Sequence, residues 1–224
     1  MAEEEANRER KGQSCSNYIR NCKDDLITLL LNGIKNVNIE DDDDDEEEWG
    51  VNMSAGCCLQ KISLLLRSDV IEPVVAFVSA NILDASWKNR YAALIALGAI
   101  AEGPEKTQFA TILVPSIGNL LNMFKDQSIK VREAISWVIN QICEHHAEVL
   151  VSSPELTEHF VNTLAESIKD FPRVSIQSCT AIEKLAESLA PEDSSKVSNQ
   201  LSPHFENIAK ALIDNSERID CEGT

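Results

Sequence analysis

Apolar residues recur along this 224-residue chain at the spacing of amphipathic helices. In one segment, Val131, Ala134, Ile135, Val138 and Ile142 fall at i, i+3, i+4, i+7 and i+11, so they share one helix face. The same spacing elsewhere predicts pairs of helices, A and B, joined by short turns. The predicted pairs span 17–35 and 50–66, 69–83 and 87–101, 106–124 and 129–146, and 154–169 and 173–189, followed by a single helix at 194–213.

A segment that begins with aspartate repeats along the chain. "DASWKNRYAALIALGAIAEG", "DQSIKVREAISWVINQICEH" and "DFPRVSIQSCTAIEKLAES" start at Asp84, Asp126 and Asp170, and "DNSERID" starts at Asp214. The steps of 42, 44 and 44 residues match the roughly 40–47 residues of HEAT and armadillo units. Two-helix units bury their apolar faces only against their neighbours. The repeats therefore predict an all-α fold, a right-handed α-solenoid of about four and a half HEAT helix pairs.

Three regions follow from this pattern. Residues 17–213 form the predicted solenoid. Residues 1–16 are predicted to be disordered or to match no repeat, and residues 214–224 to begin a further helix or a tail. A loop at 38–48 interrupts the first helix pair and contains nine consecutive acids, followed directly by Trp49. These acids are Glu40, Asp41, Asp42, Asp43, Asp44, Asp45, Glu46, Glu47 and Glu48.

The acidic loop has two open interpretations. Its mutual repulsion prevents burial, so it either attracts basic partners and speeds their encounter, or it is a solvated insertion without function. The formal charge of the chain is −17, and the loop contributes nine of these negative charges. The remaining excess of acids argues against direct binding of nucleic acid, which needs clustered Lys and Arg, and favours a basic protein or peptide.

Composition excludes several other classes. Hydrophobic residues make up 43% and aromatic residues 5%, a mixture that suits helices packed on helices. No stretch is apolar enough for a signal peptide or membrane span, so we expect a soluble intracellular protein. The seven cysteines form no CxxC pair and are predicted to be reduced core thiols; they lie at positions 15, 22, 57, 58, 143, 179 and 221.

Catalytic and metal-binding patterns are also missing from the sequence. It contains no Gly-rich phosphate loop or nucleophile motif, and "CEHH" at 143–146 lacks a second ligand pair at zinc spacing. The acidic run lacks the glycine and alternating ligands of a calcium-binding loop. We therefore predict a non-enzyme without cofactor or metal.

Trp137 lies off the apolar stripe and shares another face of its helix with Glu133, Asn140 and Glu144. An aromatic ring flanked by carboxylates is typical of a cradle for Lys or Arg. Each such contact contributes about 0.5–2 kcal/mol, so useful affinity needs several in series. The alternative is that Trp137 packs against the next repeat.

Three glutamates recur at the ends of the predicted B helices: Glu102, Glu144 and Glu187. A carboxylate at a helix C-terminus opposes the helix dipole, at a cost of a few tenths of a kcal/mol, roughly. The repetition favours use by a ligand, and a solvated helix end is the simpler alternative.

Three segments together resemble the importin-β (karyopherin-β) family of nuclear import receptors: "DDDEEEWGVNMSAGCCLQ", "ILDASWKNRYAALIALGAIAEGPEKTQ" and "DQSIKVREAISWVINQICE". The resemblance covers about residues 24–220 and implies a central portion of a longer HEAT solenoid. It implies shuttling between cytoplasm and nucleus, with importin-α or other basic cargo, Ran-GTP and Phe-Gly nucleoporins as partners.

The resemblance also assigns roles to single residues. Residues 40–48 match the acidic loop that contacts Ran-GTP. Trp49, Trp137 and Glu144 match residues on the concave surface of the B helices, which holds the basic importin-β-binding segment of importin-α in the family. Thr180 stands where the family has its next tryptophan, and Gln177 where it usually has asparagine. The alternative function, independent of the resemblance, is a HEAT-repeat scaffold or an acidic histone-chaperone-like binder.

Overall fold

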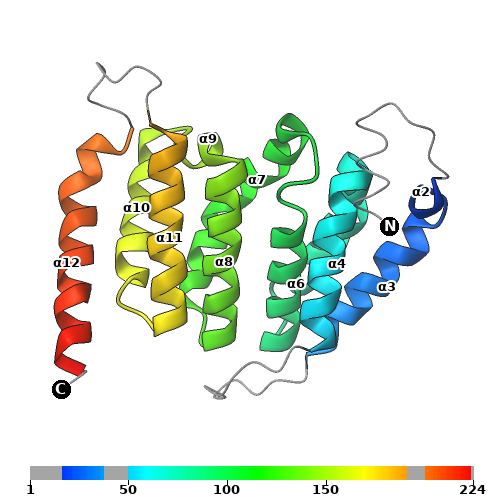
Figure 1. Ribbon diagram of the computed structural model, residues 1–224, viewed down its shortest axis with the longest axis horizontal. Coiled ribbons are helices and arrows are strands. Elements are labelled where there is room, and N and C mark those ends of the chain that lie inside the picture. The colour runs from blue at the N-terminus through cyan, green and yellow to red at the C-terminus, as the bar shows by residue number, and fades with distance from the viewer. Residues whose placement is uncertain (1–16, 38–49, 191–199, 223–224) are drawn as a thin grey trace. The chain divides into compact units, whose positions relative to one another are not determined.

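The computed structural model describes residues 17–37, 50–190 and 200–222, with side chains described as far as residue 216 (Figure 1). Within these ranges every regular element is a helix, and no helix is long and apolar enough to cross a bilayer. The all-α prediction is confirmed. The chain divides into two compact units, Met1–Ile112 and Leu113–Thr224, each of which has its own packing.

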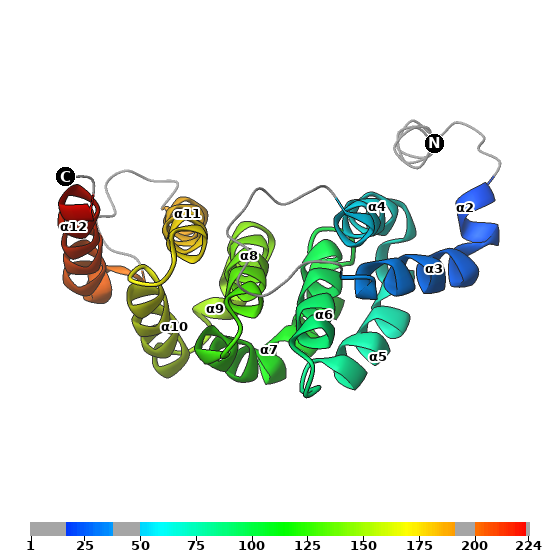
Figure 2. The same ribbon diagram turned by 90° about the horizontal axis from the view of Figure 1, so that it is seen from below.

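The first unit is built from paired helices. Its elements are α2 (Tyr18–Asn21), α3 (Lys23–Lys35), α4 (Val51–Leu66), the 3₁₀ turn η1 (Arg67–Val70), α5 (Ile71–Asn81) and α6 (Trp87–Ala99). Helix α3 packs on α4 and α5 packs on α6, while α4 also contacts α6 (Figure 2). These are the predicted A and B helices of the first two repeats, stacked on one another.

Helix α6 is buried on all sides, from Tyr91 to its C-terminal end. Helices α3, α4 and α5 all contact it, so no face is left for polar residues, and the sequence there is almost wholly Ala, Leu and Ile. The turn that follows is equally tight. A Cβ atom on Gly103 would lie 2.4 Å from the carbonyl oxygen of Ser63 in α4, so only glycine fits there.

Helix α7 (Lys106–Asn122) begins in the first unit and ends in the second. The remaining elements belong to the second unit: the 3₁₀ turn η2 (Met123–Lys125), α8 (Ile129–His145), α9 (Ala147–Leu150), α10 (Pro154–Ser167), α11 (Pro172–Ser188), the 3₁₀ turn η3 (Ser202–His204) and α12 (Phe205–Glu222). Helices α8 and α11 lie side by side as consecutive B helices (Figures 1 and 2), and α10 packs on both α11 and α12.

The apolar stripe predicted for α8 is its buried face. Val131, Ile135, Val138 and Ile142 are fully buried, and Ala134 is 3% exposed. The helix starts where Ser128 caps it, because the Ser128 hydroxyl accepts a hydrogen bond from the Val131 backbone N–H at 3.4 Å. The helical spacing in the sequence predicted this buried face, and the structure confirms it.

The last predicted helix differs from the structure at both ends. It was expected at 194–213, but α12 begins at Phe205, and residues 191–199 lie outside the described residues. Pro203 belongs to the short turn η3, where its missing N–H costs nothing. The chain from 205 to 222 contains neither Gly nor Pro, so α12 continues through Glu222 and the expected boundary at 213 is wrong.

The prediction of core cysteines is also only partly correct. Cys143 is fully buried and Cys179 partly buried, but Cys22, Cys57 and Cys58 are exposed. In α4 the buried stripe consists of Asn52, Ala55, Gly56, Leu59, Ile62, Ser63, Leu65 and Leu66. The two adjacent cysteines of α4 lie off that stripe, which its spacing already indicates.

Candidate functional site

The turns before the B helices share one local design. In the first unit the Asp84 carboxylate accepts the backbone N–H of Ser86 at 2.8 Å, which is the main reason that the pKa of Asp84 lies below its usual value. Arg90, six residues after Asp84, folds back and donates to the Asp84 carbonyl oxygen at 2.8 Å. This closes the turn and fixes where α6 begins.

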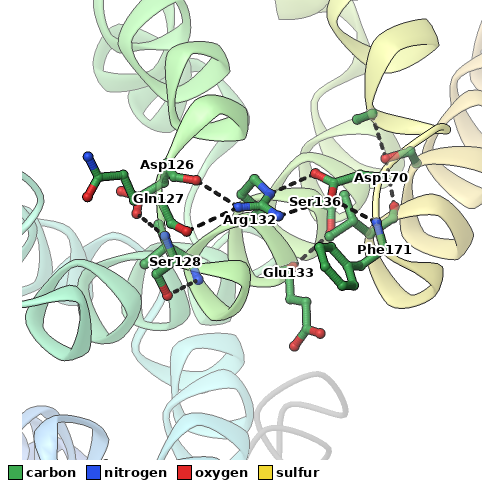
Figure 3. A network of polar contacts seen from close by, with 12 residues as sticks. Asp126, Gln127, Ser128, Arg132, Glu133, Ser136, Asp170 and Phe171 are labelled. Carbon is green, nitrogen blue, oxygen red and sulfur yellow. Dashed lines mark hydrogen bonds and ion pairs between the residues drawn. The ribbon is translucent and has the colours of Figure 1, made fainter. Parts of the chain in front are cut away.

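The turn before α8 repeats the design and extends it (Figure 3). Arg132 donates through Nη1 to the carbonyl oxygens of Asp126 and Gln127 at 2.8 and 3.4 Å. Its Nε and Nη2 donate to the two carboxylate oxygens of Asp170 at 2.7 and 3.1 Å. The guanidinium carbon also lies 5.7 Å from the ring centre of Phe171. One arginine of α8 therefore holds its own turn and the turn before α11.

The predicted cradle lies along the contact between α8 and α11. Polar side chains of the two helices meet there: Asn140 Nδ2 donates to Gln177 Oε1 at 2.8 Å, and Lys184 Nζ forms an ion pair with Glu144 Oε2. We call these four residues the α8–α11 seam. The hydrogen bond from Lys184 is the main reason that the pKa of the Glu144 carboxyl lies below its usual value.

Trp137 lies on α8 one turn before Asn140, and its side chain is neither fully buried nor fully exposed. Glu133, one turn before Trp137, forms an ion pair of 3.5 Å with Lys130, whose side chain is only 4% exposed. Both carboxylates that flank the tryptophan therefore have lysine partners within the chain. The sequence pattern did not indicate that the cradle acids are already neutralised.

The other predicted site residues are placed as follows. Glu187 is exposed near the end of α11, as predicted. Glu102 is exposed too, but it lies in the turn after α6, which ends at Ala99, and not at a helix end. Trp49 and the nine acids at 40–48 lie outside the described residues.

Sequence reasoning missed Lys184 and the double role of Arg132. Lys184 occurs in "AIEKLAE", which reads as an ordinary solvated helix face. Its importance depends on which residue of the preceding B helix lies opposite, 40 positions earlier. Arg132 carried a weak signal, because Arg90 and Arg132 both follow an Asp by six residues.

Two family models match parts of this chain. The importin subunit beta-1-like TPR repeats match residues 159–224, and the HEAT repeat matches residues 117–146. Importin subunit beta-1 of Saccharomyces cerevisiae is 33% identical over 198 residues, which is 88% of this chain and 22% of the relative. The chain thus spans about a fifth of the length of the curated relative that it matches.

Solved structures of yeast importin-β (Kap95p) share the fold along nearly the whole chain. One is a Kap95p structure in which Kap95p binding induces the switch loops of RanGDP to adopt the GTP-bound conformation. It matches this chain with a TM-score of 0.84 and 29% identity, over 95% of this chain and 25% of Kap95p. The complex of Kap95 with Nup1 matches with a TM-score of 0.84 and 28% identity, over 95% and 25% of the two chains. The repeats, the sequence identity and the shared fold together establish that this chain belongs to the importin-β family.

Proposed function

We propose that this chain serves, without catalysis, in a nuclear import receptor that shuttles between cytoplasm and nucleus. The observation that carries the proposal is the match along 95% of the chain to Kap95p, which has been solved with RanGDP and with Nup1. Those complexes support Ran and a nucleoporin as partners of this chain, and the family resemblance alone suggests that the nucleoporins are of the Phe-Gly class. The HEAT repeats support the same conclusion, because a stack of helix pairs offers extended surfaces for protein partners.

For the basic partner, we propose the helical importin-α segment or another basic cargo signal, bound on the face of α8 and α11. Trp137 is half-exposed there and Glu144 is 46% exposed, so both are accessible to a ligand. The aromatic ring would pack the stem of a Lys or Arg, and the carboxylate would pair with its charged head. Glu133, Asn140 and Glu187 complete the proposed set on this face. Glu102 and Trp49, which belong to the first unit, are proposed separately as residues that contact a basic partner.

For Ran, we propose that the acids at 40–48 contact a basic patch of Ran-GTP. Nine consecutive negative charges attract a cationic surface and speed its encounter, an effect that salt screens beyond about 8 Å at physiological ionic strength. Binding through this segment should therefore weaken steeply as salt rises.

A titration with the importin-α basic segment at two salt concentrations tests the proposed face. Trp137→Ala should weaken binding by about two- to thirtyfold, corresponding to the roughly 0.5–2 kcal/mol of one cation–π contact. Leu83→Ala is the control, since it removes an apolar side chain that is 89% exposed and outside the proposed site. Equal affinity of wild type and Trp137→Ala would refute the assignment of this face.

A pull-down with Ran loaded with GTP or GDP tests the second contact and separates the functional classes. We expect the wild type to retain more Ran-GTP, and a variant with Gly and Ser at 40–48 to retain less. A HEAT scaffold of another class would be indifferent to the nucleotide, and a histone chaperone would bind histones even with Trp137 replaced. Either of those results would favour the alternative class over the receptor.

A further inference from the structure

The α8–α11 seam brings an acid of the proposed binding face into contact with a base of the same chain. Glu144 lies in the last turn of α8 and Lys184 in the last two turns of α11. The two charges form an ion pair across the helices. Closer to the N-termini, one turn earlier on α8 and two turns earlier on α11, Asn140 Nδ2 donates to Gln177 Oε1 at 2.8 Å. The seam therefore joins the two helices at two levels.

We propose that Lys184 is an intramolecular competitor that occupies Glu144 and thereby lowers the affinity of this face for basic partners. The inference rests on the proposed function of the face. It makes Lys184 a specificity-determining residue: a partner gains the Glu144 contact only by displacing the lysine ammonium group. Partners that rely on a single cation at this point are therefore disfavoured relative to those with several.

Exposure makes such an exchange feasible. The Glu144 side chain is 46% exposed and the Lys184 side chain 26% exposed, so a ligand reaches the carboxylate without unfolding either helix. An ion pair at this level of exposure contributes only modestly to stability, because water screens it and both side chains lose freedom. The competition is therefore strong enough to tune affinity and weak enough to be reversed by a ligand.

The residues around Lys184 reinforce the effect. Thr180 lies one turn before it on α11, and its hydroxyl donates to the Ile176 carbonyl oxygen of its own helix at 3.0 Å. The hydroxyl offers no aromatic surface for the stem of a ligand Lys or Arg. On α11, a basic ligand therefore meets a positive charge at Lys184 and no compensating ring at Thr180.

Lys184→Gln tests the proposal directly. It should tighten binding of the importin-α basic segment and of an oligo-arginine peptide by about two- to fivefold, the range expected for a partly exposed ion pair. Lys169→Gln is the matched control, because it removes an equal charge from a lysine of the same unit that pairs with Asp214 at 3.6 Å. That control should leave both affinities unchanged within error.

Combining the change with Glu144→Gln separates competition from general repulsion. If Lys184 competes for Glu144, the gain from Lys184→Gln is larger when Glu144 is present than when it has been replaced. Equal gains in both backgrounds, or an equal gain from Lys169→Gln, would overturn the proposal and leave only an effect of net charge. Weaker binding by Lys184→Gln would also overturn it.

The two peptides keep this test distinct from that of the proposed function. If only oligo-arginine binds and shows the Glu144-dependent gain, the competitor role stands and the importin-α assignment fails. If the importin-α segment binds and Lys184→Gln changes nothing, the function stands and the competitor role fails. If neither peptide binds wild type or variant, both proposals fail.

Discussion

Replacing Arg132 with alanine should destabilise the second unit more than replacing any single exposed charged residue would. Its guanidinium donates two hydrogen bonds to the Asp170 carboxylate, at 2.7 and 3.1 Å. A further bond of 2.8 Å joins it to the carbonyl oxygen of Asp126. The Arg132 and Asp170 side chains are only 15% and 18% exposed. Alanine would leave the Asp170 carboxylate and two backbone carbonyl groups without this donor.

The expected loss follows from what remains after the substitution. Hydrogen bonds to charged groups contribute about 1.5–3 kcal/mol each, and breaking a buried ion pair costs about 3–5 kcal/mol. Water reaches part of this site and would replace some of the lost bonds. We therefore expect Arg132→Ala to lower the free energy of unfolding by about 2–4 kcal/mol. Arg132→Lys keeps the charge but lacks the guanidinium group that bonds both carboxylate oxygens, so it should lower the free energy of unfolding by about half as much.

Urea unfolding followed by circular dichroism measures the loss, and hydrogen exchange locates it. Protection should fall in α8 and α11 and stay unchanged in α4 and α6. Lys169→Ala is the control, because its partner Asp214 is 43% exposed and such pairs contribute about 0–1 kcal/mol. If Arg132→Ala is as stable as that control, Arg132 does not stabilise both its own turn and the turn before α11.

Three further outcomes follow from local geometry. Gly103→Ala should destabilise the first unit by about 1–3 kcal/mol, measured by thermal unfolding, since its Cβ would lie 2.4 Å from the Ser63 carbonyl oxygen; Gly118→Ala, with open space, is the control. Burial raises the pKa of the Cys143 thiol, so maleimide should label it only on unfolding, while the exposed thiols of α4 react in the folded chain. Because Lys184 lowers the pKa of Glu144, their ion pair should stabilise the fold at pH values above the unfolded carboxyl pKa of about 4.5. This stabilisation should be lost as the pH falls through the lower pKa of Glu144 in the folded chain. The difference in unfolding free energy between wild type and Glu144→Gln, measured by urea unfolding, should therefore vanish at acid pH.

The parts of the fold that sequence predicted are those fixed by short-range periodicity. The stripe from Val131 to Ile142 repeats at 3.6 residues, and the Asp-initiated turns mark where each B helix begins. The short helix α9 was missed, because four residues give no period to detect and its stability comes from packing. The predicted helix at 194–213 includes Pro203, whereas the structure places Pro203 in the turn before α12, so the predicted start is too early.

The candidate site was less predictable, because its chemistry depends on contacts between repeats. Spacing placed Glu144 on the same face as Trp137, and the structure agrees with that placement. Spacing could not show that Lys184 lies opposite Glu144, since the register between α8 and α11 is set by tertiary packing. A cradle derived from one helix thus appeared more acidic than the pair of helices is.

Stability and binding are separable on this pair of helices, because different contacts carry them. Arg132 and Asp170 join the N-terminal ends of α8 and α11, while the Ser188 hydroxyl donates to the Cys143 carbonyl oxygen near their C-terminal ends at 3.2 Å. Helices anchored at both ends stay together when a single ion pair beside one of these anchors opens. Displacement of Lys184 from Glu144 is therefore a local side-chain exchange, and Lys184→Gln should alter affinity with little change in unfolding free energy, whereas Arg132→Ala should do the reverse.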